Sequence, residues 1–410
     1  MIYQTLVLLA VLALVYSTTS GWFERRPING ALVYMLFGML FGNLGLGWLN
    51  LDIGNEGLGI IAEITLGVVL FCDAAEADFA VLERNVRIPE RLLGIGLPLT
   101  LGLGFGAALL LFDQFSYLEA AILATILAPT DAALGKAVIS DHSVPARIRT
   151  SLNVESGLND GICVPVLLAL LALAAADAAG SGFFHFMIAE VGIGVVCGVV
   201  FTFAACRLLD VASERDWMDN SWRQLPVVST ALGCFALAQL LGGSGFIAAF
   251  CGGLLFGLIA GEQKQPMLES AEATGDTLAM ITWVIFGAAV VGPALGSFSW
   301  QVVAYALLSL TVVRMLPVLL SLWGTSLSFN EKLFMAWFGP RGLASIVFVV
   351  IVLGADFPQV ETIVITVLLT ILFSVIAHGV TANLWVGALF ANKADLTGET
   401  TRSGYNVGDK

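Results

Sequence analysis

The sequence predicts an all-α, polytopic membrane protein, and three observations support that prediction. Of the 410 residues, 58% are hydrophobic and only 12% are charged, and the mean hydropathy is +0.92. Soluble domains have about 25% charged residues, so this chain has too few to cover a surface that faces water. Long apolar segments recur along the whole chain, and the basic residues between them alternate regularly. Most of the chain is therefore expected to face lipid.

Thirteen segments are apolar and long enough to be transmembrane helices, because a helix needs about 20 residues to cross ~30 Å of hydrocarbon. They cover residues 2–20, 28–48, 57–73, 92–112, 117–139, 148–174, 183–207, 225–241, 245–261, 273–295, 299–323, 331–354 and 359–390. Two long uncharged runs are divided where glycine and proline favour turns, at residues 242–245 and around Gly292 and Pro293. The first segment lacks the basic residues that begin a signal peptide, so we expect it to be a retained helix.

The basic residues predict the orientation of these segments through the positive-inside rule. Of the 18 Lys and Arg residues, only Arg314 and Arg341 lie deep inside predicted spans, and the others lie in loops or at span ends. The other sixteen all follow odd-numbered spans, whereas the loops after even-numbered spans contain acids but no Lys or Arg. We expect the N-terminus outside, the C-terminus in the cytoplasm, and a multi-pass protein of the plasma (inner) membrane. Residues 1–390 are expected to form one membrane domain, and residues 391–410 a short cytoplasmic tail.

Several other classes of function have no basis in the sequence. The formal net charge of −13 offers no basic surface for a nucleic acid. The six cysteines lie in apolar runs without a CxxC pair, and no HExxH, Walker A or GxSxG motif occurs. We therefore expect neither an enzyme nor a cofactor, and no nucleic-acid partner, while the apolar surface is expected to contact membrane lipids.

Two predicted spans are interrupted by proline and glycine next to a charge. The segment LAPTDAALG at 127–135 places Pro129 and Asp131 inside the fifth span, and WFGPRGLAS at 337–345 places Pro340 and Arg341 inside the twelfth. Paired interruptions in corresponding positions of two halves indicate a transporter site built on an inverted repeat. Two simple proline kinks would explain the prolines, but not why each interruption carries a charge.

A polar patch follows the first interruption. In SLNVESGLNDG at 151–161, Glu155 and Asn159 are four residues apart, as are Ser156 and Asp160, so a helix brings all four to one patch. Such oxygen groups next to freed backbone carbonyls suit a hard cation such as sodium. Because burial disfavours the charged form of carboxylates in general, such a group binds a proton and a cation in competition. A structural polar cluster that joins two helices is the simpler alternative.

The buried charges suggest which carboxylate is available for exchange. An unpaired buried ion is strongly disfavoured, so Arg314 is a candidate partner of Glu155, and Arg341 of Glu63. Asp131 is expected to face half-helix N-termini, whose amides carry partial positive charge. These pairings leave Asp160 as the exchanging carboxylate. One such group would carry one monovalent cation in one direction and one proton in the other.

At these residues the chain resembles the first monovalent cation–proton antiporter family, the NhaP/NHE-type sodium–proton exchangers. Three motifs carry the resemblance over nearly the whole chain: APTD at 128–131, NVESGLNDG at 153–161 and FGPRGLAS at 338–345. A weaker stretch, AEITLGVVLF at 62–71, is similar to the family's third helix and would make Glu63 its membrane-embedded glutamate. The acidic stretch at 73–78 departs from the glycine that many relatives have there, and no role is assigned to it.

The resemblance implies an NhaP/NhaA-like fold of 13 helices with an inverted repeat and two discontinuous crossing helices. It also implies a homodimer in which a core part, approximately 57–174 and 273–390 (spans 3–6 and 10–13), moves against a dimerisation part formed by the remaining spans. Asp160 would bind the cation or the proton. Ser156 and the Thr130 carbonyl would ligate Na⁺ with Asp160, and Glu155 would act through water. The supporting residues would be Asp131, Asn159, Arg314, Arg341 and Glu63.

The sequence thus predicts a secondary antiporter that exchanges Na⁺, or else Li⁺ or K⁺, for H⁺. Asn159 before Asp160 resembles the electroneutral branch of the family, which agrees with the one-to-one exchange inferred from the buried charges. A related-fold sodium-coupled solute symporter is the main alternative, since it also uses paired broken helices. It would need a larger substrate cavity and no aspartate that exchanges protons for cations. A channel or a membrane-embedded enzyme has less support, because neither a repeated pore loop nor a nucleophile motif occurs.

Overall fold

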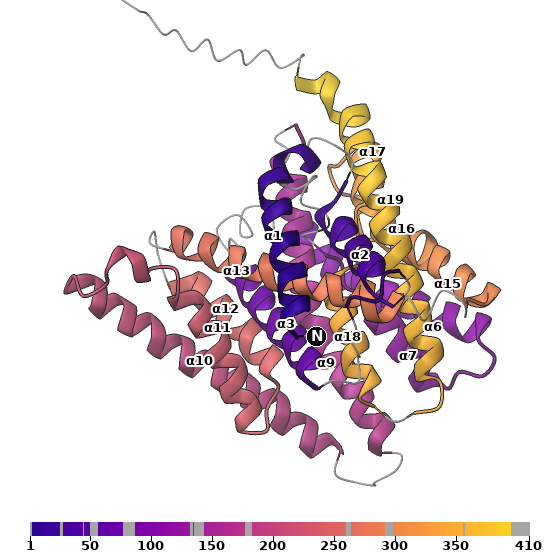
Figure 1. The fold of residues 1–410 in the computed structure, drawn as a ribbon. Coiled ribbons are helices and arrows are strands. Elements are labelled where there is room, and N and C mark those ends of the chain that lie inside the picture. The colour runs from indigo at the N-terminus through magenta and orange to yellow at the C-terminus, as the bar shows by residue number, and fades with distance from the viewer. Residues whose placement is uncertain are drawn as a thin grey trace, which may run out of the picture.

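The structure is a computed structural model. It describes residues 2–24, 28–43, 45–49, 56–76, 87–131, 134, 143–176, 183–259, 264–291, 298–355 and 357–394. Within these ranges every regular element is a helix (Figure 1), which confirms the predicted all-α class. The elements are α1 (Ile2–Glu24), α2 (Gly30–Phe41), α3 (Glu56–Glu76), α5 (Arg87–Arg91), the π-helix η1 (Leu92–Gly96), α6 (Leu97–Leu111), α7 (Tyr117–Ile126), α9 (Ala146–Ala176), α10 (Phe183–Glu214), the 3₁₀ turn η2 (Asn220–Trp222), α11 (Pro226–Leu240), α12 (Gly245–Ile259), α13 (Lys264–Ile285), the π-helix η4 (Phe286–Val291), α15 (Trp300–Leu310), α16 (Val312–Ser321), α17 (Phe329–Trp337), α18 (Leu343–Leu353) and α19 (Val360–Ala394).

Six helical stretches are long and apolar enough to cross a membrane: Tyr3–Phe23, Arg87–Leu111, Ala146–Ala174, Ile188–Glu214, Trp300–Ser321 and Val360–Phe390. Shorter apolar helices occur at Gly30–Phe41, Tyr117–Ile126, Pro226–Leu240, Gly245–Ile259 and Leu343–Leu353. Each of the thirteen predicted segments overlaps at least one described helix. A multi-pass membrane protein follows from these helices, while the number of crossings stays a prediction.

The second predicted segment, 28–48, is too long. Helix α2 ends at Phe41, and the chain then turns back, with the Leu46 and Leu49 amides donating to the carbonyls of Leu40 and Phe41 at 2.8 and 2.7 Å. Gly47 has a φ of +67°, a conformation that glycine adopts without a steric penalty. The glycine-rich sequence GNLGLG at 42–47 therefore favours a turn although its hydropathy suits a helix.

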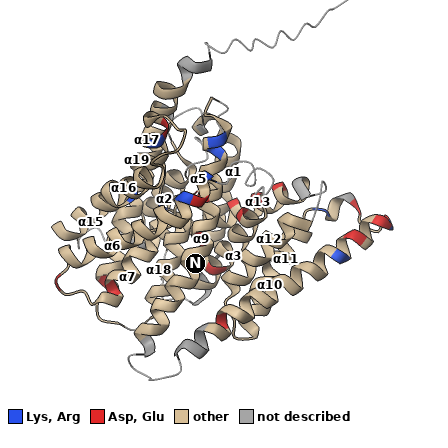
Figure 2. Ribbon diagram, turned by 180° about the vertical axis from the view of Figure 1, so that it is seen from behind, with Lys and Arg blue, Asp and Glu red and all other residues tan. Residues whose placement is uncertain are grey.

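The helices pack in two groups. In one, α10, α11 and α12 pack on one another, α11 and α12 also pack on α3, and α13 packs on α2 and α3. In the other, α6 packs on α7, α15 and α16, and α19 packs on α15 and α18. The groups lie on opposite sides in both views (Figures 1 and 2). Helices α3 and α13, which the sequence analysis assigns to the core part, thus have most of their contacts with α2, α11 and α12; their smaller contacts include α9 and α18.

Charged residues are sparse on these helices and lie mostly near their ends (Figure 2). Among the described residues, the buried charged side chains are Asp131, Glu155, Asp160, Arg314 and Arg341 and two capping glutamates, Glu119 and Glu331. An ionised group at membrane depth is expensive, so such residues usually mark a functional site. The first five lie on α9, on α16 and at the ends of α7, α17 and α18.

Candidate functional site

The two predicted interruptions are non-helical segments that contact each other. Helix α7 ends at Ile126 and is followed by non-helical residues 127–131; helix α17 ends at Trp337 and α18 begins at Leu343. Across the junction the Asp131 amide donates to the Pro340 carbonyl at 2.8 Å, and the Ser345 hydroxyl donates to the Ile126 carbonyl at 2.8 Å. Residues 132, 133 and 135–139, the rest of the fifth predicted span, lie outside the described residues.

Asp131 caps a helix that belongs to the other interruption. Its Oδ2 accepts a hydrogen bond from the Leu343 amide at 2.7 Å, and its Oδ1 accepts one from the Leu134 amide at 3.2 Å. Leu343 is the first residue of α18, whose N-cap Gly342 has no side chain to offer. A Cβ at Gly342 would overlap the Asp131 carboxylate. The expected position of Asp131 against a half-helix N-terminus is confirmed.

Arg341 is fully buried and bonds the first interruption through its side chain. Its Nη1 donates to the Ala128 and Pro129 carbonyls at 2.8 and 2.9 Å, and its amide donates to Ser374 Oγ at 2.6 Å. Among the described residues no ion pair joins it to Glu63, which is half-buried on α3. The expected pair of Glu63 and Arg341 is therefore wrong. Carbonyls freed by the broken helix replace the carboxylate, which a count of charged residues does not reveal.

Three polar residues of the predicted site form one network. Thr130 and Asn159 exchange two hydrogen bonds: Asn159 Nδ2 donates to Thr130 Oγ1 at 2.8 Å, and the Thr130 amide donates to Asn159 Oδ1 at 3.3 Å. Ser156 Oγ donates to the Thr130 carbonyl at 2.5 Å. Helix α9 thus binds the first interruption, at Thr130, through Ser156 and Asn159, which lie about one helical turn apart. Two oxygens that the sequence analysis assigns to a cation, Ser156 Oγ and the Thr130 carbonyl, lie side by side.

Glu155 and Arg314 form a buried, two-pronged ion pair. Arg314 Nη1 lies 2.5 Å from one carboxylate oxygen of Glu155, and Nη2 lies 3.0 Å from the other. A Cβ at Gly339 would overlap the Arg314 guanidinium, so this glycine of the second interruption leaves room for the arginine. The expected pairing of Glu155 with Arg314 is confirmed.

Asp160 lies one turn beyond Ser156 on α9 and is 6% exposed. Its Oδ1 has no hydrogen-bond donor among the residues that the structure describes. The charged groups that act on Asp160 are Asp73 and Asp131, which repel a negative charge, and Arg341, which attracts one. A buried carboxylate oxygen without a donor is an acceptor for an incoming proton or cation.

Sequence reasoning missed Asp73. It lies on α3 and packs against α9, where a Cβ on Gly157 would be 3.3 Å from the Asp73 Cβ. Through this contact Asp73 becomes a close electrostatic neighbour of Asp160. The sequence contains one indication of this role, because Asp73 is the first residue of the acidic stretch at 73–78, two residues after Phe71.

Sequence reasoning also missed His378 on α19. Its Nδ1 lies 3.2 Å from Ser374 Oγ and 2.9 Å from the Ser374 carbonyl, and its Nε2 lies 3.0 Å from the carbonyl of Trp337. Because Ser374 Oγ also accepts from the Arg341 amide, this chain ties α19 to both ends of the second interruption. A histidine in an apolar helix gives no sequence signal of such a role.

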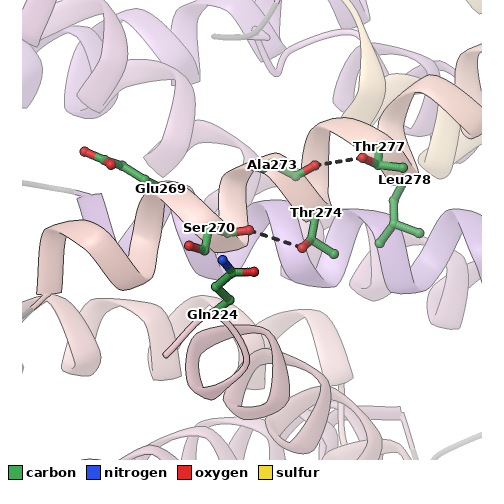
Figure 3. Close-up of a pocket in the computed structure, with 7 residues that line it drawn as sticks. All are labelled: Gln224, Glu269, Ser270, Ala273, Thr274, Thr277 and Leu278. Carbon is green, nitrogen blue, oxygen red and sulfur yellow. Dashed lines mark hydrogen bonds between the residues drawn. The ribbon is translucent and has the colours of Figure 1, made fainter. Parts of the chain in front are cut away.

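A shallow groove of about 620 Å³ lies beside α13 (Figure 3). It contains none of the predicted site residues. Glu269 and the hydroxyls of Ser270, Thr274 and Thr277 line it from α13, and Gln224 lines it from the chain before α11. Glu272 and Asp276 of the same helix are electrostatic neighbours of Asp73, so acidic groups extend from α13 toward Asp160.

Comparison with known proteins decides the family. The family profile described as "Sodium/hydrogen exchanger, transmembrane" matches residues 8–387. The chain belongs to the sodium/hydrogen exchanger family. The resemblance inferred from the three motifs is thereby confirmed.

Individual members of this family are similar at low identity. The K(+)/H(+) antiporter NhaP of Alkalimonas amylolytica is 26% identical over 355 residues, which are 85% of this chain and 59% of that protein. A probable Na(+)/H(+) antiporter of Schizosaccharomyces pombe is 25% identical over 351 residues, 79% of this chain and 45% of that protein. The chain therefore spans about half the length of these two relatives.

The fold of this exchanger-family chain has a solved counterpart. The sodium proton antiporter MjNhaP1 from Methanocaldococcus jannaschii, in its structure at pH 8, superposes with a TM-score of 0.75 at 20% identity. The match covers 92% of this chain and 98% of that one. At this identity the likeness establishes the fold alone.

Proposed function

We propose that the chain is a secondary antiporter that exchanges a monovalent cation for a proton, with Asp160 as the exchanging group. One observation carries the proposal: Asp160 is the buried carboxylate of the site with an oxygen that no described donor occupies. Glu155 is held by Arg314 through both oxygens, and Asp131 accepts from two main-chain amides. Asp160 is therefore the carboxylate available to a ligand.

The cation would be Na⁺, Li⁺ or K⁺, held by Asp160, Ser156 Oγ and the Thr130 carbonyl, with Glu155 acting through water. These are hard oxygen donors, which suit such ions. Ser156 Oγ and the Thr130 carbonyl lie 2.5 Å apart, so a cation that contacts one reaches the other by replacing their hydrogen bond. Related proteins named as K(+)/H(+) and Na(+)/H(+) antiporters support this class of substrate without deciding between the ions.

Competition for one carboxylate gives the mechanism. A proton neutralises Asp160 and abolishes its attraction for the cation, and a bound cation disfavours protonation, so each ligand displaces the other. An unliganded charge at this depth is disfavoured in the membrane, so the site moves between the two faces with one ligand or the other. With Glu155 and Arg314 neutralising each other, the exchange is one cation for one proton and moves no net charge.

Alternating access would come from movement of one helix group against the other. We propose an inverted repeat with two discontinuous helices that cross at the 127–131 and 338–342 interruptions, within 13 transmembrane helices. The moving part would contain α6, α7, α9 and α15–α19, which carry every site residue except Glu63 and Asp73. Helices α3 and α13 would lie at its boundary with the dimerisation part, and acids on both would attract cations from the α13 side.

The proposal extends to the oligomeric state of the protein, its membrane and its orientation. We propose a homodimer in the plasma (inner) membrane, with the N-terminus outside and the C-terminus in the cytoplasm. The alternation of the basic residues supports this orientation.

The test is a proteoliposome assay with an acidic lumen and a fluorescent dye that reports the pH gradient. Addition of Na⁺, Li⁺ or K⁺ outside should dissipate the gradient with wild-type protein and leave it intact with Asp160→Asn. Choline chloride is the control for salt alone. Antiport is refuted if none of the three cations releases protons, and a requirement for an added organic solute would favour the symporter.

A further inference from the structure

The two interrupted helices begin with the same polar cap. Ser116 accepts from the Glu119 amide at 3.2 Å, and Glu119 Oε2 accepts from the Ser116 amide at 2.8 Å. At the start of α17, Ser328 accepts from the Glu331 amide at 3.3 Å, and Glu331 Oε2 accepts from the Ser328 amide at 2.8 Å. Each pair is a capping box, which satisfies amides that the first helical turn leaves without partners.

In both caps the second carboxylate oxygen of the glutamate accepts a hydrogen bond from a residue of another element. Glu119 Oε1 accepts from the amide of Gln359, the residue before α19, at 3.0 Å. Glu331 Oε1 accepts from Nη2 of Arg147, the second residue of α9, at 2.8 Å. Both glutamates are buried, at 5% and 4% exposed. Each links the first turn of an interrupted helix to the start of another long helix.

The two links are equivalent by position. A separation of 212 residues relates Ser116 to Ser328, Glu119 to Glu331, and Arg147 to Gln359. The links also run crosswise, because α7 of the first half is joined to α19 of the second, and α17 of the second half to α9 of the first. A chance pair of helix caps would not share both the spacing and the exchange of partners.

We infer that Glu119 and Glu331 are equivalent positioning residues, each of which braces an interrupted helix against the start of the long helix, α19 or α9, that follows the interruption of the opposite half. The inference rests on the proposed function, because its consequence is the rate of exchange. Helices α7 and α17 have only 10 and 9 residues before the interruption, and helices this short depend on tertiary contacts for their stability. The brace fixes the first turn of each of these helices. It thereby also positions the carbonyls and charged residues of the interruption that follows the last turn.

Substitution of either glutamate by glutamine distinguishes the effect of the cap from that of the link to the other helix. Glu119→Gln and Glu331→Gln keep one oxygen, which can still accept from the serine amide, since glutamine is accepted in a capping box. The amide nitrogen then faces a second donor, the Gln359 amide or the Arg147 guanidinium, and the link is lost. Ser116→Ala and Ser328→Ala are the matched controls: each removes a hydroxyl of the cap and leaves both carboxylate oxygens in place.

The experiment compares these four variants in the proteoliposome assay. We expect Glu119→Gln and Glu331→Gln to lower the maximal rate about fivefold or more, and to change the half-saturating cation concentration by less than about twofold, because positioning affects turnover more than ground-state binding. The two serine variants should stay within about twofold of wild type in both parameters. Wild-type rates in both glutamine variants, or equal slowing in the serine controls, would overturn the inference.

A second measurement does not depend on transport. Melting midpoints of purified Arg147→Gln, Glu331→Gln and the double variant form a cycle, and the double variant should melt no lower than the less stable single variant, because both changes remove one link. Additive losses would contradict the brace. If wild-type vesicles exchange no cation, the proposed function fails, whereas the melting cycle still decides whether the brace exists.

Discussion

Arg314 donates a hydrogen bond to each carboxylate oxygen of Glu155, and the two side chains are only 5% and 4% exposed. Replacing a buried pair by neutral groups is often tolerated, whereas removal of one partner leaves an uncompensated charge and costs about 3–5 kcal/mol. We expect Arg314→Gln to lower the melting midpoint strongly, and Glu155→Gln/Arg314→Gln to recover much of the loss. Thermal unfolding in detergent measures both. A single variant as stable as wild type would mean that the pair has no structural importance.

Gly342 should be intolerant of a methyl group. Because its Cβ would overlap the carboxylate that caps α18, Gly342→Ala must displace either Asp131 or the start of the helix. Loss of the cap with the steric overlap is expected to cost about 2–4 kcal/mol and to abolish exchange. Gly102→Ala, at an exposed helical position with open space around it, is the control and should behave as wild type. Melting and dye-based exchange on both proteins decide the matter.

The side chain at position 378 should be replaceable by glutamine but not by alanine. A carbonyl only accepts, so the bond to Trp337 requires the hydrogen on Nε2, whereas with the hydrogen on Nδ1 the ring donates to the Ser374 carbonyl instead. Gln can supply that donor, so His378→Gln should melt above His378→Ala by an amount equivalent to about 1 kcal/mol. Equal midpoints for the two variants would exclude the hydrogen bond to Trp337 as a source of stability.

Asp160→Asn should be stable and inactive. The amide removes a buried charge, so without added cation the variant should melt at or above the wild-type midpoint. Added cation should stabilise only the wild type, by about 2.7 kcal/mol at a concentration 100 times the dissociation constant. Titrations with sodium and choline chlorides provide the measurement and its control. Equal stabilisation of both proteins by sodium would place the cation elsewhere.

Exchange should not respond to membrane voltage. With one exchanging carboxylate and a neutral Glu155–Arg314 pair, each cycle moves one positive charge in each direction. Proteoliposomes clamped with valinomycin at zero and at an imposed potential should therefore dissipate the proton gradient at equal rates, tested with sodium as the transported cation. A rate that rises with potential would require a second ligand-binding charge.

The sequence predicted two contacts of the site, that of Glu155 with Arg314 and that of Asp131 with a helix N-terminus, because membrane burial restricts what a charge can do. Buried Glu155 needs a positively charged partner, and Arg314 is one of two basic residues deep within the predicted spans. Buried Asp131 needs hydrogen-bond donors, and the start of a broken helix has free main-chain amides. Ser156 and Asn159 were placed correctly by helical periodicity. Each of these inferences uses a local rule or a shortage of alternatives.

The failures have a different physical origin. Arg341 found its acceptors in the Ala128 and Pro129 carbonyls, and no composition or charge count shows which backbone groups a tertiary contact leaves available. Asp73 approaches the site where α3 packs closely on α9 at Gly157, a tertiary contact that the sequence does not reveal. The sequence gives no sign of the role of Glu119, because nothing local indicates that Gln359 lies beside it. Helix boundaries such as the end of α2 depend on turn geometry that hydropathy does not describe.

The bonds between the two interruptions also bear on why a carrier of ions need not conduct them. Bare carbonyls in the middle of a bilayer would be hydrated, and a continuous file of water molecules passes protons without control. Here the carbonyls of Ala128, Pro129, Thr130 and Pro340 accept from Arg341, Ser156 and Asp131. With these acceptors occupied by the protein itself, the freed carbonyls are closed to water and Asp160 Oδ1 stays open. In the proposed antiporter a proton would then cross on the side chain that has taken it up, and the gradient would not be lost through a leak.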